Sequence, residues 1–338
     1  DGALSNRNLI INGAMQVAQR GGGATTFSYA TVDRFKPTEG STSTLAILQE
    51  PSNDAPSGFG KSYKITTTTA ETMSGSKQLA VFHAIEAQNL QHLGYGTPEA
   101  QSITVSFWVK SSVTGAYCLS LYENDANRNI GATYTINSAN TWEYKTITFP
   151  PDTVGVINND NGGGLETYFF LSVGPDRKTA DNTSWATWSA ARFGYGQVAD
   201  VAGTTNATWQ ITGVQLEVGD TATPFEHRSY GDELALCQRY YQQVDRGSGI
   251  CPFATRAYMN IPYIKTMRAV PSFGTTGPLA VNDARVNASQ STAHIIAYNP
   301  NTSGSFTEMH NFSPSLVQYS AVLMRGNTGN FVTLDAEL

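Results

Sequence analysis

The sequence predicts an all-β protein: an antiparallel jelly-roll sandwich, a short connecting α-helix and a smaller C-terminal β domain. Charged residues make up only 14% of the 338 residues and glycine occurs 31 times. Thr, Ser, Asn and Tyr are abundant, where long helices would need Ala, Leu, Glu and Lys. Short runs that alternate between apolar and polar residues follow one another, separated by clusters of Gly, Asn, Asp and Pro, which is typical of strands joined by turns.

The alternating runs place the sandwich in residues 1–225. In the run 102–110, Ile103, Val105 and Phe107 fall on one face and the residues between them on the other, as in a strand with one buried face. Repetition of this pattern without intervening helices favours a jelly roll over a βαβ fold. The clearest runs begin at Ser62, Gln78, Ser102, Ala116, Trp142, Thr167 and Thr208.

The segment 226–247 breaks the alternation and is predicted to be a helix with a linker. Leu234, Cys237 and Tyr241 recur at helical spacing. A serine cap and two acidic residues in the first turn strengthen the helix signal, so we expect a helix over about 231–243.

Alternating runs resume in residues 248–338, which we expect to form a C-terminal β tip domain. The clearest of these runs begin at Ala257, Ala293, Ser315 and Phe331.

Composition excludes several function classes. The net charge of −6 gives no electrostatic support for a nucleic-acid partner, and no apolar run reaches the about 20 residues of a membrane span. The three cysteines, Cys118, Cys237 and Cys251, form no C-x-x-C pair, and we interpret them as buried apolar residues. The five histidines never occur as H-x-x-H or H-x-H, so we expect no metal site of that kind.

No catalytic motif is present, and we predict no catalytic residue. Glycoside hydrolysis needs two carboxyl groups about 5–10 Å apart. The acidic residues on strand-like runs are expected to be solvated instead; they are Glu86, Glu123, Glu143, Glu166 and Glu217.

An aromatic segment, 181–197, is the best candidate for ligand binding. Trp185, Trp188 and Tyr195 lie in a stretch rich in Gly, Ser and Thr without clean alternation. Aromatic rings with a polar handle suit the amphipathic faces of sugars, so we predict these three as ligand-binding residues. In the alternative, Trp188 and Phe193 only anchor a long loop onto the sandwich.

The segment 8–16, "NLIINGAMQ", resembles the first strand of jelly-roll carbohydrate-binding modules. "ITVSFWVK" from Ile103 is similar to their central strand, and "ITGVQLEVG" from Ile211 to their closing strand. The chain as a whole resembles the C-terminal region of bacteriophage tail-fibre proteins, especially those of marine and cyanobacterial phages. The similarity is strongest over residues 213–241, with further matches in "TVDRF", "MRAVPSF" and the final "DAEL".

The resemblance implies a non-catalytic adhesin, a receptor-binding protein at the distal end of a virion's tail fibre, outside the cell. Its partners would be host cell-surface polysaccharide or lipopolysaccharide and two further copies of itself in a homotrimer. It also implies that this chain is the C-terminal piece of a longer protein, with "GALSNRN" at the junction to an N-terminal fibre shaft.

A structural calcium is common in such modules, but the matching positions here are Gln16 and Thr212–Gly213. We therefore expect no cofactor, although the oxygen-rich loop from Asn158 could hold calcium weakly. Two alternatives stay open: a tailspike-type polysaccharide depolymerase, and a purely structural fibre or capsid-decoration protein.

Overall fold

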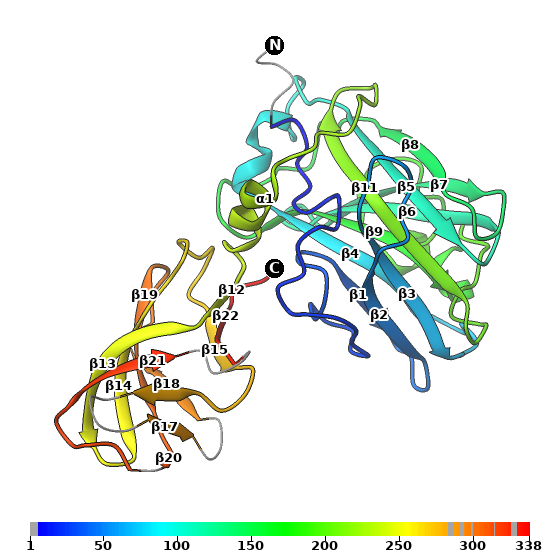
Figure 1. The fold of residues 1–338 in the computed structure, drawn as a ribbon. Coiled ribbons are helices and arrows are strands. Elements are labelled where there is room, and N and C mark those ends of the chain that lie inside the picture. Colours follow the sequence, from blue (N-terminus) through cyan, green and yellow to red (C-terminus); the bar gives the residue numbers. More distant parts are fainter. Residues whose placement is uncertain (1–5, 283–286, 291–293, 299, 314, 326–329) are drawn as a thin grey trace. The chain divides into compact units, whose positions relative to one another are not determined.

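The computed structural model describes residues 6–282, 287–290, 294–298, 300–313, 315–325 and 330–338. It divides into two compact units, Asp1–Glu233 and Leu234–Leu338, drawn from blue to yellow-green and from yellow to red in Figure 1. The predicted fold class is confirmed: the chain is mostly β, with antiparallel sheets in a jelly-roll sandwich, a short helix and a smaller β unit. The proposed fibre junction falls largely on residues 1–5, which lie outside the described residues. Within the described residues, no helix has the length and apolarity that crossing a membrane requires.

Unit 1 consists of two antiparallel sheets. The six-stranded sheet has the order β1-β4-β9-β6-β7-β10, and the five-stranded sheet the order β2-β3-β11-β5-β8. The strands are β1 Lys36–Gly40, β2 Ala46–Ser52, β3 Ser62–Thr69, β4 Gln78–Glu86, β5 Ile103–Ser111, β6 Gly115–Glu123, β7 Arg128–Ile136, β8 Glu143–Phe149, β9 Gly163–Val173, β10 Ala186–Thr187 and β11 Thr208–Val218. Three 3₁₀ turns accompany them: η2 Ala87–Leu93, η3 Pro175–Arg177 and η4 Ala190–Arg192.

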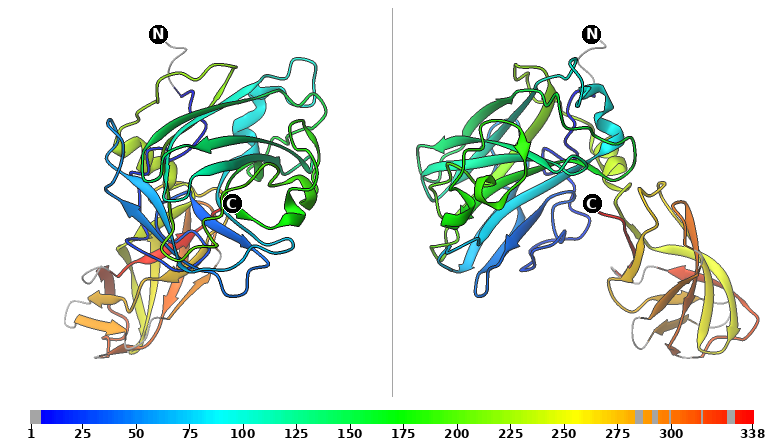
Figure 2. Two further views of the ribbon diagram at one scale, coloured as in Figure 1. Left: turned by 90° about the vertical axis from the view of Figure 1, so that its right-hand side faces the viewer. Right: turned by 180° about the vertical axis from the view of Figure 1, so that it is seen from behind.

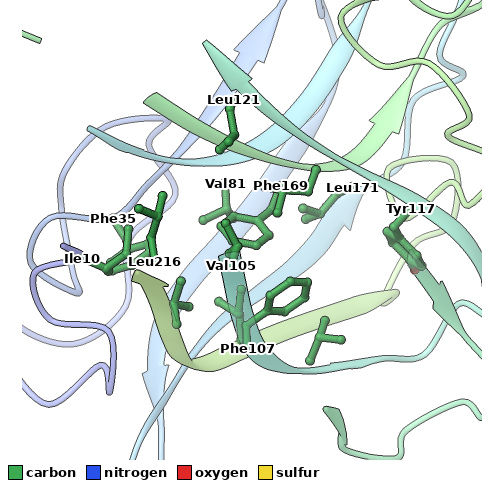
Figure 3. Close-up of a cluster of buried hydrophobic side chains, with 14 of the residues drawn as sticks. Ile10, Phe35, Val81, Val105, Phe107, Tyr117, Leu121, Phe169, Leu171 and Leu216 are labelled. Carbon is green, nitrogen blue, oxygen red and sulfur yellow. The ribbon is translucent and has the colours of Figure 1, made fainter. Parts of the chain in front are cut away.

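The core of unit 1 lies between the inner faces of the two sheets, as Figure 3 shows. Val81 of β4 and Phe169 of β9 are directly paired in the six-stranded sheet. The ring of Phe107, from β5 of the other sheet, lies 5.1 Å from that of Phe169. All three are fully buried. Because side chains alternate between faces, burying one set fixes the register of each strand and sends the other set outward.

All seven alternating runs predicted in the sandwich are strands in the structure, namely β3, β4, β5, β6, β8, β9 and β11. In β5, Ile103, Val105 and Phe107 are fully buried, which confirms the predicted inner face.

The N-terminal segment 8–16 differs from the predicted strand. It forms turns beside β11, where the Leu9 amide donates to the Leu216 carbonyl at 2.9 Å. Asn12 has a positive φ of 62°, a conformation that asparagine tolerates but that no strand contains. Its buried side chain bonds the backbone of Val17 and Asp33. These bonds hold the turn that replaces a strand.

The connecting helix is shorter than predicted. Helix α1 spans Tyr230–Cys237, and Ser229 caps it by accepting a hydrogen bond from the Asp232 amide at 3.1 Å. From Tyr241 the chain is a strand, β12, because Tyr241–Val244 pairs with the strand β22 near the C-terminus. Tyr241 is therefore not on the helix, since tertiary pairing overrides its helical spacing.

Unit 2 consists of a three-stranded sheet, β12-β22-β15, and an eight-stranded sheet, β18-β19-β14-β13-β21-β16-β17-β20. Its core is formed largely by methionine and small aliphatic residues, and Cys251 belongs to it. All three cysteines are free and buried, as expected. The strands are β12 Tyr241–Val244, β13 Arg246–Phe253, β14 Arg256–Pro262, β15 Ser272–Thr275, β16 Ala280–Asn282, β17 Asn287–Gln290, β18 Ile295–Tyr298, β19 Gly304–Met309, β20 Phe312–Ser313, β21 Ala321–Arg325 and β22 Val332–Asp335.

Candidate binding site on the six-stranded sheet

The outer face of the six-stranded sheet carries aromatic side chains. Phe82 of β4 is paired with Tyr168 of β9, and their rings lie 5.1 Å apart. Phe170 follows on β9, and Tyr122 lies on the neighbouring strand β6. Each comes directly after a core residue, Phe169 or Leu121, and so lies on the opposite face of the sheet. The period of two that builds the inner core therefore also places a row of rings on the opposite face.

The segment 174–198, the first part of the connection between β9 and β11 and drawn in green in Figure 2, lies on this outer face. Two buried amides tie it down. The Asn182 side chain donates to Ser120 Oγ at 3.0 Å and accepts from Asn129 Nδ2 at 2.8 Å. Gln197 Oε1 accepts from the Cys118 amide at 2.6 Å. Because both ends are fixed to sheet strands, this segment holds a defined position over the sheet.

Phe193 is the apolar centre of this packing. Its ring lies 4.7 Å from Tyr168, 5.2 Å from Phe170 and 5.9 Å from Trp188. Phe193 is 5% exposed, while Tyr168 and Tyr122 are partly exposed and Trp188 is 36% exposed. The cluster thus has a buried centre and a rim of amphipathic rings that water reaches.

Beside this rim the surface forms a hollow of about 340 Å³. Aromatic rings supply part of its wall and amide, hydroxyl and guanidinium groups supply the rest. It is lined by Thr38, Gln78, Tyr122, Asn127, Tyr168, Arg177, Trp188 and Phe193. An apolar wall with a few placed polar groups is the usual composition of a small-molecule site.

Gln78 lines the hollow and carries a buried acceptor without a partner. The residue is 8% exposed, and its Oε1 atom has no hydrogen-bond partner among the described residues. Buried polar atoms are nearly always paired in folded proteins, so an orphaned acceptor indicates a group that a ligand or water satisfies. A hydroxyl donor in the hollow would complete it.

Glu166 borders this face and is already engaged. Its carboxylate accepts from the Tyr168 hydroxyl at 2.7 Å and from Asn124 Nδ2 at 2.9 Å. Burial raises the pKa of Glu166, and these two hydrogen bonds partly offset the increase. The Tyr168 hydroxyl is correspondingly fixed, which orients its ring toward Phe193.

The structure places the three predicted ligand-binding residues in different settings. Trp188 lines the hollow, and its backbone amide donates to the Asn127 carbonyl at 2.9 Å. Trp185 does not line it: this side chain packs against the main core, lies edge-on to Tyr95 at 5.9 Å and donates to the Pro150 carbonyl at 2.8 Å. Tyr195 is 38% exposed and also lies outside the lining residues.

Sequence reasoning missed Tyr122, Tyr168, Gln78 and Arg177. A signal for the two tyrosines was available, because they occupy the outward phase of strongly alternating runs. Nothing in the local sequence marks Gln78 or Arg177.

The expectation of solvated glutamates on the strands is wrong for Glu86, Glu123 and Glu217, which are 0–3% exposed. Each lies where another segment covers the sheet: Glu217, for example, accepts from the Thr223 amide at 2.9 Å. Glu143 and Glu166 are partly exposed. The loop from Asn158, considered for calcium, uses its Asp160 carboxylate to accept from the Gly162 amide at 2.8 Å. No group of three or more acidic, His or Cys side chains suited to a metal occurs among the described residues.

No protein-family model matches this chain, and no curated protein matches it. Among solved structures, the enzymatically active domain of tailspike protein 4 from bacteriophage CBA120 has a TM-score of 0.36 at 12% identity, with 62% of this chain and 21% of that chain covered. The family 11 carbohydrate-binding module of a Clostridium thermocellum cellulosomal cellulase has a TM-score of 0.31 at 11% identity, covering 61% and 98%. A putative sugar-binding protein from Bacteroides thetaiotaomicron has a TM-score of 0.34 at 11% identity, covering 63% and 100%.

Proposed function

We propose that this chain is a non-catalytic glycan-binding protein and that the hollow beside Trp188 is its glycan site. The observation that carries the proposal is the pairing, in one hollow, of an aromatic wall with the polar side chains of Gln78, Asn127 and Arg177. Sugar rings present apolar C–H faces and a rim of hydroxyls. Aromatic side chains match the faces, and amide and hydroxyl groups match the rim.

We further propose a setting at the distal end of a phage tail fibre, where the glycan would be host cell-surface polysaccharide or lipopolysaccharide. This part rests on the sequence resemblance of residues 213–241 to tail-fibre C-terminal regions. The alternative of a depolymerase is disfavoured by the burial of Glu86, Glu123 and Glu217, since a glycosidase needs two carboxyl groups that reach the substrate.

A homotrimer is part of the same proposal, and the outer face of the eight-stranded sheet supports it. Phe306 pairs with Tyr298 on β18, and Tyr258 pairs with Ile250 on β13, all on the face opposite the buried Met259. Six large apolar side chains on this face are 38–55% exposed: Ile250, Phe253, Ile296, Tyr298, Phe306 and Leu323.

Taking about 200 Å² for a whole large side chain, these six expose roughly 550 Å², which approaches the about 800 Å² per partner of a stable interface. A second copy of this chain is the proposed occupant, because most homo-oligomers are closed, symmetric assemblies. Around helix α1, Cys237, Tyr240 and Tyr241 are buried and unavailable to a partner, whereas Leu236 is 38% exposed.

The test of glycan binding is an array of host-type and plant-type oligosaccharides probed with the whole chain. The proposal expects selective binding that Trp188→Ala weakens. Release of reducing ends from a bound polysaccharide would contradict the non-catalytic proposal and favour the depolymerase. An array without any binding would favour a purely structural role.

A further inference from the structure

We infer that the hollow recognises a glycan carrying an acidic substituent, a uronate carboxylate or a sulfate ester, through the guanidinium of Arg177. This inference rests on the proposed glycan site and specifies the class of sugar. Arg177 is the one charged side chain among the eight residues that line the hollow.

The backbone holds Arg177 in a fixed position. It ends the 3₁₀ turn η3, which Pro175 begins. The Gly194 amide donates to the Arg177 carbonyl at 2.9 Å, and the Gly174 amide donates to the Lys77 carbonyl at 2.8 Å. The turn that carries Arg177 is therefore bonded to Gly194, later in the connection, and to Lys77, just before β4. A cation held in this way loses little entropy when it binds.

The Arg177 guanidinium has N–H donors that remain available to a ligand. Its Nε atom donates to the Ser76 carbonyl at 2.7 Å, which fixes the plane of the group. No carboxylate of the described residues lies within ion-pair distance of Arg177, whereas Arg128, for example, is held by Asp152 at both ends of its fork. Glu166, whose carboxylate binds the lining residue Tyr168, is engaged by Tyr168 and Asn124.

The partial burial of Arg177 favours the binding of an anion. Desolvation lowers the pKa of Arg177, although a guanidinium stays charged at any physiological pH. A partly buried cation without an anion carries a desolvation cost that an incoming anion relieves. A planar guanidinium fork also matches the oxygens of carboxylate or sulfate better than a single hydroxyl.

Gly40, on the edge strand β1, lets Arg177 and Gln78 lie close to the backbone. A Cβ atom at Gly40 would lie 3.1 Å from Gln78 Cγ, and 3.3 Å from both Arg177 Nη2 and Gln78 Nε2. The guanidinium and the Gln78 amide are therefore neighbours at this edge of the sheet. An acid group on Arg177 and a neighbouring hydroxyl on Gln78 can be held by one sugar unit, while Trp188 and Tyr122 contact its ring.

The experiment compares matched glycans by calorimetry and on an array: trigalactose against trigalacturonate, triglucose against triglucuronate, and each neutral oligosaccharide against its sulfated form. We expect acidic members to bind at least tenfold more tightly than neutral partners, with an affinity that falls as salt is added. Arg177→Gln should remove that preference, so that acidic and neutral members bind with equal affinity. The uronate and sulfate arms distinguish the two sources of negative charge.

Lys265→Gln is the charge-matched control, because Lys265 is exposed on unit 2 and loses the same charge. It should change nothing. Equal affinity for neutral and acidic members, or an acid preference that survives Arg177→Gln, would overturn the inference and leave the glycan site standing. Binding that neither Arg177→Gln nor Trp188→Ala alters would place the site elsewhere and overturn both proposals.

Discussion

The carboxyl group of Glu123 lies directly against the Cα atom of Gly155, so that a methyl group at Gly155 would collide with Glu123 Oε2. Glu123 is fully buried and neither carboxyl oxygen has a hydrogen-bond partner among the described residues. Burial raises the pKa of Glu123 to about 8, and the negative charge of Asp152 adds to the increase. A glutamate that sequence places on a solvated face is thus a neutral core residue near neutral pH.

The first prediction concerns the pH dependence of stability. The unfolded chain releases this proton near pH 4.3, whereas the folded chain keeps it to about pH 8. Protonated Glu123 therefore contributes fully to the stability of the folded chain below about pH 4. The free energy of unfolding then falls as the pH rises toward 8, by up to about 1.4 kcal/mol per pH unit. Glu123→Gln should flatten the unfolding free energy over this range, as measured by denaturant titration. Glu50→Gln, in a partly exposed pair with Lys64, should not flatten it. Parallel curves for Glu123→Gln and the parent chain would contradict the assignment.

The second prediction separates the two tryptophans. Trp188→Ala should weaken glycan binding about tenfold, because a lost ring contact of about 1–2 kcal/mol corresponds to that factor. Its melting temperature should change little, since the ring is 36% exposed. Trp185→Ala is the counterpart: it should lower the melting temperature, because it loses packing on Tyr95 and the bond to Pro150, and leave affinity intact. The reverse pattern in calorimetry and thermal melts would place the site at Trp185.

The third prediction concerns the attachment of the segment 174–198. Gly131→Ala should lower both stability and glycan affinity, because its Cβ would collide with Asn182 Nδ2 and come within 2.8 Å of Ser120 Oγ. Gly22→Ala meets nothing within 4 Å and serves as the control for glycine loss. Unchanged melting and affinity in Gly131→Ala would mean that Asn182 does not hold the connection.

The fourth prediction concerns self-association. Phe306→Glu should dissociate the proposed trimer, because a charge replaces an apolar side chain that the partner covers. Light scattering at micromolar concentration measures the mass directly. Val154→Glu alters a similarly exposed residue of unit 1 and should leave the trimer intact. A monomer mass for the parent chain would refute the assembly.

The sequence by itself determined the strands and their inner faces. Alternation is local: a run such as 102–110 carries its own period of two, and that period alone predicts which of its residues are buried. The length and composition of the runs further indicated a sandwich, and the serine cap indicated where helix α1 begins.

Only the tertiary structure decided where distant segments meet. Helix α1 ends at Cys237 because Tyr241–Val244 pairs with Val332–Asp335, a contact between residues about ninety positions apart that no local pattern encodes. The hollow likewise joins Gln78 of β4 and Arg177 of η3 to Trp188 of the connection. Burial of Glu123 depends on Gly155 in another loop. Local periodicity predicts whether a residue lies in a strand and on which face. A binding site and a shifted pKa depend instead on the distant segments that pack against that strand.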